Sequence, residues 1–250
     1  DVCSSDLEGV GTGADGGPRI VPGVEINAAE SSRTRRAALG RDRGELHLLG
    51  YGVDIDAPAI DRLLARQRVL RRERIAMMLD RLLATFPDLP IDRSLVEPGD
   101  DDVAVGRPAL GAALVRAGHA QDMEDAFRRY LAPGTAWYVP RRGVDAIEAI
   151  EAIRADGGVA VLAHPFGLIS DPDAVDPLVD AGLRGLEVHY RAFDAPTVDA
   201  LGAIAVRKGL LATGGSDYHG HDAPRDYAGW IAGARIPDAV GETILGAIAA

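Results

Sequence analysis

The chain has 250 residues, enough for one large α/β domain or for a domain that carries an inserted subdomain. Its formal net charge of -11 argues against non-specific binding to nucleic acid, and no duplex DNA partner is expected, because such binding needs a cationic face. The sequence contains no apolar stretch of about 18 residues, so we expect no membrane span. The single cysteine, Cys3, cannot form an internal disulfide; this fits a reducing compartment, and the cytoplasm is the expected location.

The first seven residues, "DVCSSDL", resemble the translation of a sequencing-library adapter. We therefore expect residues 1–7 to be foreign to the natural protein, whose own sequence then begins near Glu8. An ordinary polar tail is the alternative.

Two short apolar segments predict strands in the first part of the chain. The segment "GGPRIVPGVEIN" (16–27) predicts a turn followed by a strand whose end carries Glu25. The segment "GELHLLGYGVD" (44–54) predicts a second strand with His47 at its centre.

A long helical region follows. From residue 57 to about 83, apolar residues recur at helical spacing while arginines occupy the other face. Two more helical patterns, at 106–118 and 122–131, come with no strand between them. This run of helices predicts a helical subdomain inserted into a β/α domain.

Strands and helices alternate again in the second half of the chain, as in parallel βαβ units that close, or nearly close, a barrel. The predicted elements are a helix at 143–156, a strand at 158–165, a helix at 173–182, a strand at 185–190, a helix at 194–208, a strand at 210–219 and a helix from Pro237. We therefore expect a β/α domain at 8–56 and 142–250, with the insertion at 57–141.

Polar side chains that can bind metals fall on four of the predicted strands. Glu25, His164, Asp217 and His219 come at strand ends, and His47 lies within its strand. The carboxyl ends of parallel strands meet at one rim, where ligands bind in β/α folds. Imidazoles and carboxylates together suit zinc, manganese or iron. Any one of these residues could be an ordinary core or rim residue, but the set together predicts a metal site.

Four motifs, in this order, resemble the PHP (polymerase and histidinol phosphatase) family, and within it the stand-alone nucleotide phosphoesterases called TrpH-like. They are "VPGVEI", "ELHLLGY", "VAVLAHP" and "TGGSDYHG". The resemblance spans residues 18 to about 235. It implies a distorted seven-stranded, TIM-like (β/α) barrel with two or three divalent metal ions (Mn, Zn, Fe or Mg) at its rim.

Carried over residue by residue, the resemblance makes Glu25 a ligand that bridges two metals, and makes His47, His164, Asp217 and His219 further ligands. Glu25, His164 and His219 are the expected catalytic residues. His189 matches no ligand position.

The chain departs from the family pattern at its start. Family members begin with a His-x-His strand, whereas residues 1–24 contain no histidine. We expect that truncation removed these ligands, that the barrel is incomplete at the N-terminus, and that this chain is a weak or inactive enzyme.

The insertion is the expected source of substrate contacts. Arg107 and Arg141 could pair with a second phosphate, and Trp137 or Tyr138 could stack on a base. The alternative for Trp137 is a core anchor between the insertion and the barrel.

The resemblance implies hydrolysis of a phosphate monoester of a small nucleotide, such as a 3',5'-nucleoside bisphosphate, to a nucleoside 5'-monophosphate and phosphate. A 5'-to-3' exonuclease acting on short RNA is the nearest alternative. A non-catalytic PHP-like binding module and an unrelated amidohydrolase barrel are the others.

Overall fold

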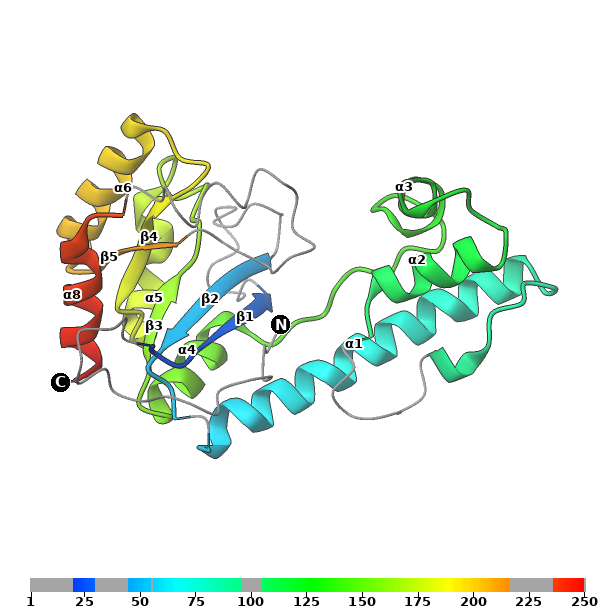
Figure 1. Ribbon diagram of the computed structural model, residues 1–250, viewed down its shortest axis with the longest axis horizontal. Helices are drawn as coiled ribbons and strands as arrows, with labels where there is room; N and C mark the ends of the chain where they lie inside the picture. Colours follow the sequence, from blue (N-terminus) through cyan, green and yellow to red (C-terminus); the bar gives the residue numbers. More distant parts are fainter. Residues whose placement is uncertain (1–19, 30–44, 55, 96–104, 216–235, 250) are drawn as a thin grey trace. The chain divides into compact units, whose positions relative to one another are not determined.

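The computed structural model describes residues 20–29, 45–54, 56–95, 105–215 and 236–249. The chain divides into two compact units. Unit 1 comprises Asp1–Asp61 and Val144–Ala250, and unit 2 comprises Arg62–Gly143. Figure 1 shows the strands in unit 1, whereas unit 2 is helical in its described residues.

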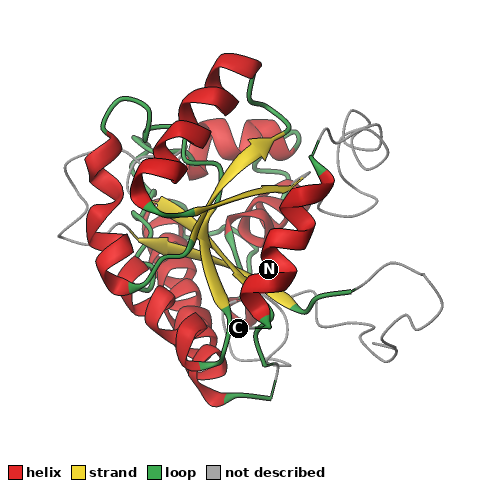
Figure 2. Cartoon of the chain, turned by 90° about the vertical axis from the view of Figure 1, so that its left-hand side faces the viewer, coloured by secondary structure: helices red, strands yellow, loops and turns green. Residues whose placement is uncertain are grey.

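A five-stranded sheet lies at the centre of unit 1 in the described part of the chain. Its spatial order is β1 (Gly23–Ala29), β2 (Glu45–Tyr51), β3 (Val159–Leu162), β4 (Gly185–Tyr190) and β5 (Leu211–Gly215). β2 pairs antiparallel with both β1 and β3, whereas β3, β4 and β5 pair in parallel. Figure 2 shows these strands crossing the middle of the fold with helices around them.

The burial pattern of the strands fixes which side chains face the core. All four residues of β3 are buried, as expected for a strand that is covered on both faces. In β2, by contrast, buried Leu46 and Leu48 alternate with half-buried His47 and Leu49. Because successive side chains of a strand point to opposite faces, His47 projects away from the side that buries Leu46 and Leu48.

Helices pack against the sheet in the order that the sequence alternation predicts. α4 contacts β1, β2 and β3, α6 contacts β4 and β5, and α8 contacts β5. The elements between the strands are α4 (Ala146–Ala155), η3 (Pro172–Val175), α5 (Asp176–Ala181) and α6 (Ala195–Lys208), and α8 (Asp238–Ile248) follows later.

Local chemistry sets the bounds of two of these helices. The Asp145 carboxylate accepts the backbone N–H of Ile147 at the start of α4, and the Asp194 carboxylate accepts that of Thr197 at the start of α6. α6 ends at Gly209, whose φ of 66° is a left-handed conformation that glycine adopts without a steric penalty.

Unit 2 has its own hydrophobic core. Its elements are α1 (Pro58–Thr85, which begins in unit 1), η1 (Arg93–Leu95), α2 (Arg107–Arg116), α3 (Met123–Ala126) and the π-helical turn η2 (Phe127–Leu131). The core residues include Ile75, Met78, Leu79, Leu82, Leu110, Leu114 and Leu131, all at most 1% exposed. The predicted helices at 57–83, 106–118 and 122–131 are thus present, the last as a short helix and a π turn.

The sheet corrects the predicted strands in two respects. Parallel strands were predicted for the second half of the chain, and β3, β4 and β5 are parallel, but β2 runs antiparallel to both of its neighbours, as a sheet of parallel strands alone would not. Glu25 was placed at a strand end, but it is the third residue of β1. The fold is mixed α/β with five strands in the described residues, so the seven-stranded barrel remains a proposal. No described helix has the length and hydropathy that a membrane span requires.

Candidate metal centre

Glu25 and His47 form the accessible part of a candidate metal centre on β1 and β2. Nδ1 of His47 donates a hydrogen bond to Oε1 of Glu25 at 2.6 Å. Glu25 lies opposite Leu49 and His47 lies opposite Asn27, so Glu25 and His47 are diagonal neighbours on one face of the antiparallel pair of β1 and β2. Their side chains are 30% and 32% exposed, which leaves both within reach of solvent and ligands.

His164 forms the buried part of the same centre, two residues after the end of β3. Its backbone φ is 31°, and no other non-glycine residue in the described part of the chain has a positive φ. Its backbone N–H donates to Oε2 of the buried Glu187 at 2.8 Å. A left-handed backbone at a non-glycine residue costs of order 1–3 kcal/mol, and such strain clusters at functional sites.

These three side chains converge. The imidazole rings of His47 and His164 meet edge to face, with centroids 4.8 Å apart and an interplanar angle of 68°. One ligand atom from each of Glu25, His47 and His164 can be chosen so that all three lie within 4.8 Å of one another. The sequence placed these residues on three separate strands, and the fold brings them together.

The donor set fits a divalent transition metal. Two imidazole nitrogens and a carboxylate oxygen are ligands that zinc, manganese and iron accept. The hydrogen bond between His47 and Glu25 joins two atoms that could each donate a lone pair to an ion. Metal binding would replace the shared proton, because ligating nitrogens must be deprotonated.

Glu187 is a buried acidic residue next to the centre that the sequence analysis did not identify. Glu187, in the middle of β4, is only 3% exposed. The pKa of Tyr51 is raised to about 12, first by burial, then by the nearby charge of Glu187 and, to a smaller extent, by that of Glu25. The hydrogen bond of Tyr51 with Thr213 acts in the opposite direction and lowers this pKa. Tyr51 therefore stays a neutral phenol at physiological pH. An acidic residue inside the otherwise apolar run "GLEV" was the signal in the sequence.

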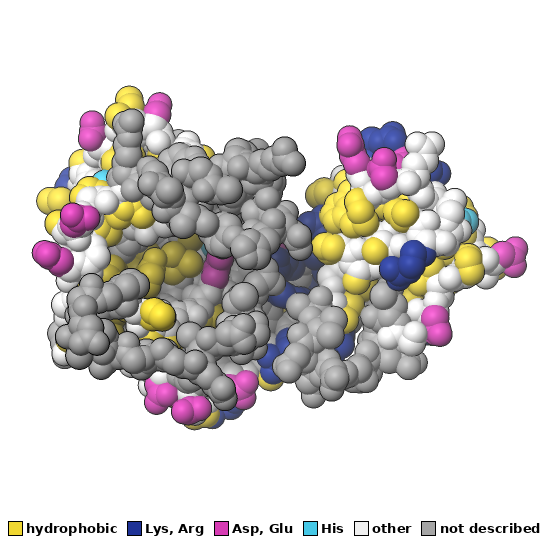
Figure 3. All heavy atoms as spheres, viewed as in Figure 1, with side chains coloured by type: hydrophobic (Ala, Val, Ile, Leu, Met, Phe, Trp, Pro, Cys, Tyr) yellow, Lys and Arg dark blue, Asp and Glu magenta, His cyan; other side chains and the backbone are white. Residues whose placement is uncertain are grey.

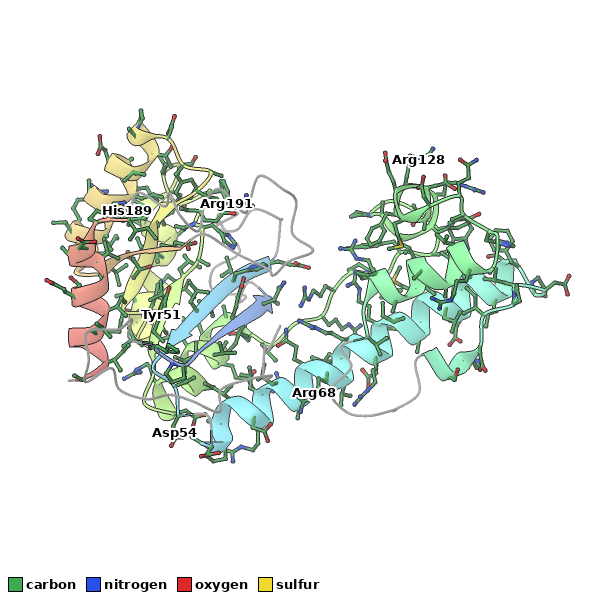
Figure 4. The ribbon with its side chains drawn as sticks, viewed as in Figure 1. Tyr51, Asp54, Arg68, Arg128, His189 and Arg191 are labelled. Carbon is green, nitrogen blue, oxygen red and sulfur yellow. The ribbon has the colours of Figure 1, made fainter. Side chains whose placement is uncertain are left out.

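Two predicted ligands, Asp217 and His219, lie outside the described residues. β5 ends at Gly215, two residues before Asp217, and Gly215 pairs with Tyr190 at the end of β4. His189 belongs to none of the candidate metal groups found in the described part of the chain, and burial lowers its pKa. Figure 4 labels it on β4.

Three residues of the insertion for which substrate contacts were predicted, Arg107, Trp137 and Tyr138, have partners within unit 2. The Arg107 guanidinium lies 5.5 Å from the Phe127 ring centroid and 5.9 Å from that of Tyr138. Trp137 Nε1 donates to Oγ1 of Thr85 at 3.0 Å, so its packing partners include a helix of the insertion itself. Arg141 also makes contacts. A substrate role for Arg107, Tyr138 and Arg141 stays a proposal.

Comparison with known proteins connects this geometry to phosphoester hydrolysis. The chain is 31% identical to a phosphoribosyl 1,2-cyclic phosphate 1,2-diphosphodiesterase of Eggerthella lenta, over 82% of this chain and 74% of the relative. It is 30% identical to the 5'-3' exoribonuclease Rnm of Escherichia coli, over 80% and 65%. It is 28% identical to a 3',5'-nucleoside bisphosphate phosphatase of Chromobacterium violaceum, over 87% and 74%.

Two solved structures are similar to this chain in fold and in sequence. A protein of Bifidobacterium adolescentis described as a metal-dependent phosphoesterase superposes with a TM-score of 0.65 at 29% identity, covering 92% of this chain and 77% of that one. A Chromobacterium violaceum protein named an amidohydrolase, with bound sulfate, gives a TM-score of 0.60 at 27% identity, covering 81% and 68%. No protein-family model matches the chain. Its similarity to these phosphoester hydrolases shows that the chain belongs to the PHP family of metal-dependent phosphoesterases.

Proposed function

We propose that this chain hydrolyses a phosphate monoester of a small nucleotide, converting a 3',5'-nucleoside bisphosphate to a nucleoside 5'-monophosphate and phosphate. The observation that carries the proposal is the convergence of Glu25, His47 and His164, whose ligand atoms lie within 4.8 Å of one another. The relative named a 3',5'-nucleoside bisphosphate phosphatase supports this substrate.

Each residue of the proposed centre has a role set by its chemistry. Glu25 can bridge two ions because a carboxylate has two oxygens, and His47 and His164 each offer one nitrogen. We assign Asp217 and His219 to the same centre, with Glu25, His164 and His219 as the catalytic residues. Two or three bound divalent ions would lower the pKa of a water nucleophile and neutralise charge on the phosphate.

The hydrogen bond between His47 and Glu25 has a consequence for this centre. It fixes the orientation of both side chains, so the ligand atoms already face one another before an ion binds. Preorganised ligands lose little conformational entropy on binding. Glu187 accepts a hydrogen bond from the backbone N–H of His164, and this contact also orients a ligand before an ion binds.

Exonucleolytic cleavage of short RNA from its 5' end is the second candidate. The specific observation in its favour is the 30% identity to the Rnm exoribonuclease. The net charge of -11 favours small substrates, because a long polyanion would be repelled.

The test is a substrate panel with added Mn²⁺: adenosine 3',5'-bisphosphate, adenosine 5'-monophosphate, a 5'-phosphorylated oligoribonucleotide, and a ribose 1,2-cyclic phosphate 5-phosphate. We expect phosphate release from the bisphosphate and none from the 5'-monophosphate. Preferred cleavage of the oligonucleotide or the cyclic ester would replace the proposed substrate with that one.

His47→Gln should lower the rate by at least about a hundredfold, because even indirect supporters of metal ligands cost 10- to 100-fold. The matched control is His119→Gln, which changes a histidine that packs on Phe86 in unit 2. An equal loss of rate in the two variants would contradict the assignment of His47 to the metal centre. Metal content near zero together with no turnover of any substrate would favour the non-catalytic module.

A further inference from the structure

A cluster of aromatic rings borders the candidate metal centre in unit 1. The ring centroid of Phe166 lies 6.1 Å from that of His164, and the centroid of Tyr190 lies 5.4 Å from it. Phe193 completes the cluster, at 5.0 Å from Phe166 and 5.2 Å from Tyr190. Phe166 lies in the segment that follows β3, Tyr190 is the last residue of β4, and Phe193 lies in the segment that follows β4.

One ring of this cluster is presented to solvent. Phe166 is 37% exposed, whereas Tyr190 is 4% exposed and forms the base of the cluster. Phe166 is among a small number of large apolar side chains with such exposure in the described residues. Figure 3 shows hydrophobic side chains exposed among acidic ones on the described surface of unit 1.

The backbone holds the exposed ring in place. The Phe166 N–H donates to the carbonyl of His164 at 2.8 Å, and the Phe193 N–H donates to that of Tyr190 at 3.0 Å. Phe166 also meets Tyr190 and Phe193 edge to face, at interplanar angles of 84° and 78°. An edge-to-face arrangement is the favourable geometry for aromatic pairs, and it fixes the Phe166 ring from two directions.

The spacing suits a nucleotide. A phosphate at the metal centre would lie beside His164, and the neighbouring aromatic ring is 6.1 Å from that imidazole, so one sugar can span the interval. Aromatic side chains stack on nucleobases with little sequence preference. The Arg191 guanidinium lies 5.8 Å from the Tyr190 ring centroid, which adds a cation directly after β4 (Figure 4).

We propose that Phe166, held by Tyr190 and Phe193, is a stacking platform for the base of the nucleotide substrate. This inference rests on the proposed function and deepens it, since it locates base recognition on the unit that carries the metal centre. In unit 2 the Trp137 ring already packs against Phe86 and Tyr130, with centroids 5.6 Å and 5.2 Å away.

The experiment compares a substrate with a base and one without it. Phe166→Ala should raise KM for adenosine 3',5'-bisphosphate about 5- to 150-fold, the range that stacking on one base supplies, with kcat little changed. KM for the abasic analogue, a ribose bisphosphate, should change by less than about twofold. Phe166→Tyr, which keeps the ring, should restore binding. The matched control is Ile169→Ala, which removes a 41% exposed apolar side chain from the same segment.

Equal losses with the base-bearing and abasic substrates would overturn the platform, because they would mean that Phe166 supports the metal centre. An unchanged KM for the bisphosphate would overturn it too. Equilibrium binding of adenosine 5'-monophosphate, measured by calorimetry, separates this inference from the proposed reaction. If the wild-type chain hydrolyses nothing but binds this nucleotide, and Phe166→Ala abolishes that binding, the reaction fails and the platform stands. If neither protein binds it, the platform fails.

Discussion

The carboxylate of Glu187 accepts the backbone N–H of His164 at 2.8 Å, in a part of β4 where Glu187 is 3% exposed. This contact joins Glu187, within β4, to His164, which lies two residues after the end of the neighbouring strand β3. It holds His164 in a left-handed conformation, with φ of 31°, and so sets where the imidazole lies.

The first prediction concerns this contact. Glu187→Ala should lower the free energy of unfolding by about 1.5–3 kcal/mol, the range for a hydrogen bond to a charged group. It should also weaken Mn²⁺ binding by about 10- to 100-fold, because His164 loses its support. Glu187→Gln keeps an acceptor oxygen and should retain most of the metal affinity. Chemical denaturation and Mn²⁺ titration by electron paramagnetic resonance measure the two effects, and equal metal affinities in wild type and Glu187→Ala would contradict the positioning role.

The second prediction concerns Glu25, the proposed bridging ligand. Glu25→Gln keeps the size of the side chain but removes its charge, so divalent-metal affinity should fall by at least about tenfold. Stability without metal should change little, because the Glu25 side chain is 30% exposed and surface ion pairs contribute about 0–1 kcal/mol. Calorimetric titration with Mn²⁺ and Zn²⁺ checks the first expectation, and thermal unfolding in a chelator checks the second. Asp145→Asn, which alters an acidic helix cap distant in sequence, serves as the control.

The third prediction concerns pH. The pKa of Tyr51 is raised from 10.0 to about 12, first by burial and then by the charge of Glu187. The neutral phenol is therefore favoured in the folded state. The stability that this provides is fully present below pH 10 and is lost as the pH rises from about 10 to about 12.

Ultraviolet titration of phenolate absorbance checks this shift. One tyrosine should ionise late, near pH 12, in the folded chain, and that late step should be missing in Tyr51→Phe. The loss of stability between pH 10 and pH 12 should also be smaller in Tyr51→Phe. Retention of the late step in the variant would assign it to a different tyrosine.

The fourth prediction concerns the core of unit 2. Leu82 is fully buried there, so Leu82→Ala should lower the free energy of unfolding by about 2–5 kcal/mol, through lost burial and a residual cavity. Leu82→Met nearly conserves the volume and should cost less than about 1.5 kcal/mol. Equilibrium denaturation of both variants measures the difference. A cost below 1 kcal/mol for the alanine variant would mean that the core relaxes around the missing side chain.

Local sequence signals predicted the elements of the structure well. The strand at 185–190 was predicted with the bounds that β4 has, and the helix at 194–208 differs from α6 by one residue. Helical periodicity likewise located α1 in a run of arginine-rich sequence. These features depend on residues a few positions apart, so the sequence contains the information.

Contacts between distant residues could not be predicted in the same way. The antiparallel pairing of β1 with β2 makes Glu25 a diagonal neighbour of His47, yet the prediction had Glu25 at a strand end and did not pair the two strands. Phe166 drew no attention in the sequence, because a single phenylalanine has no period or spacing to mark it. Glu187 was overlooked although it interrupts the apolar run "GLEV".

The sequence by itself determined the order and type of the elements and the residue types able to bind a metal. Only the tertiary structure decided that Glu25, His47 and His164 meet, that Glu187 lies beneath His164, and that Phe166 is held exposed beside them. The physical reason is that helix and strand periodicity arises from neighbours along the chain. Strand direction, register and side-chain convergence arise instead from packing between distant segments, such as those of Glu25 and His164, which are 139 residues apart.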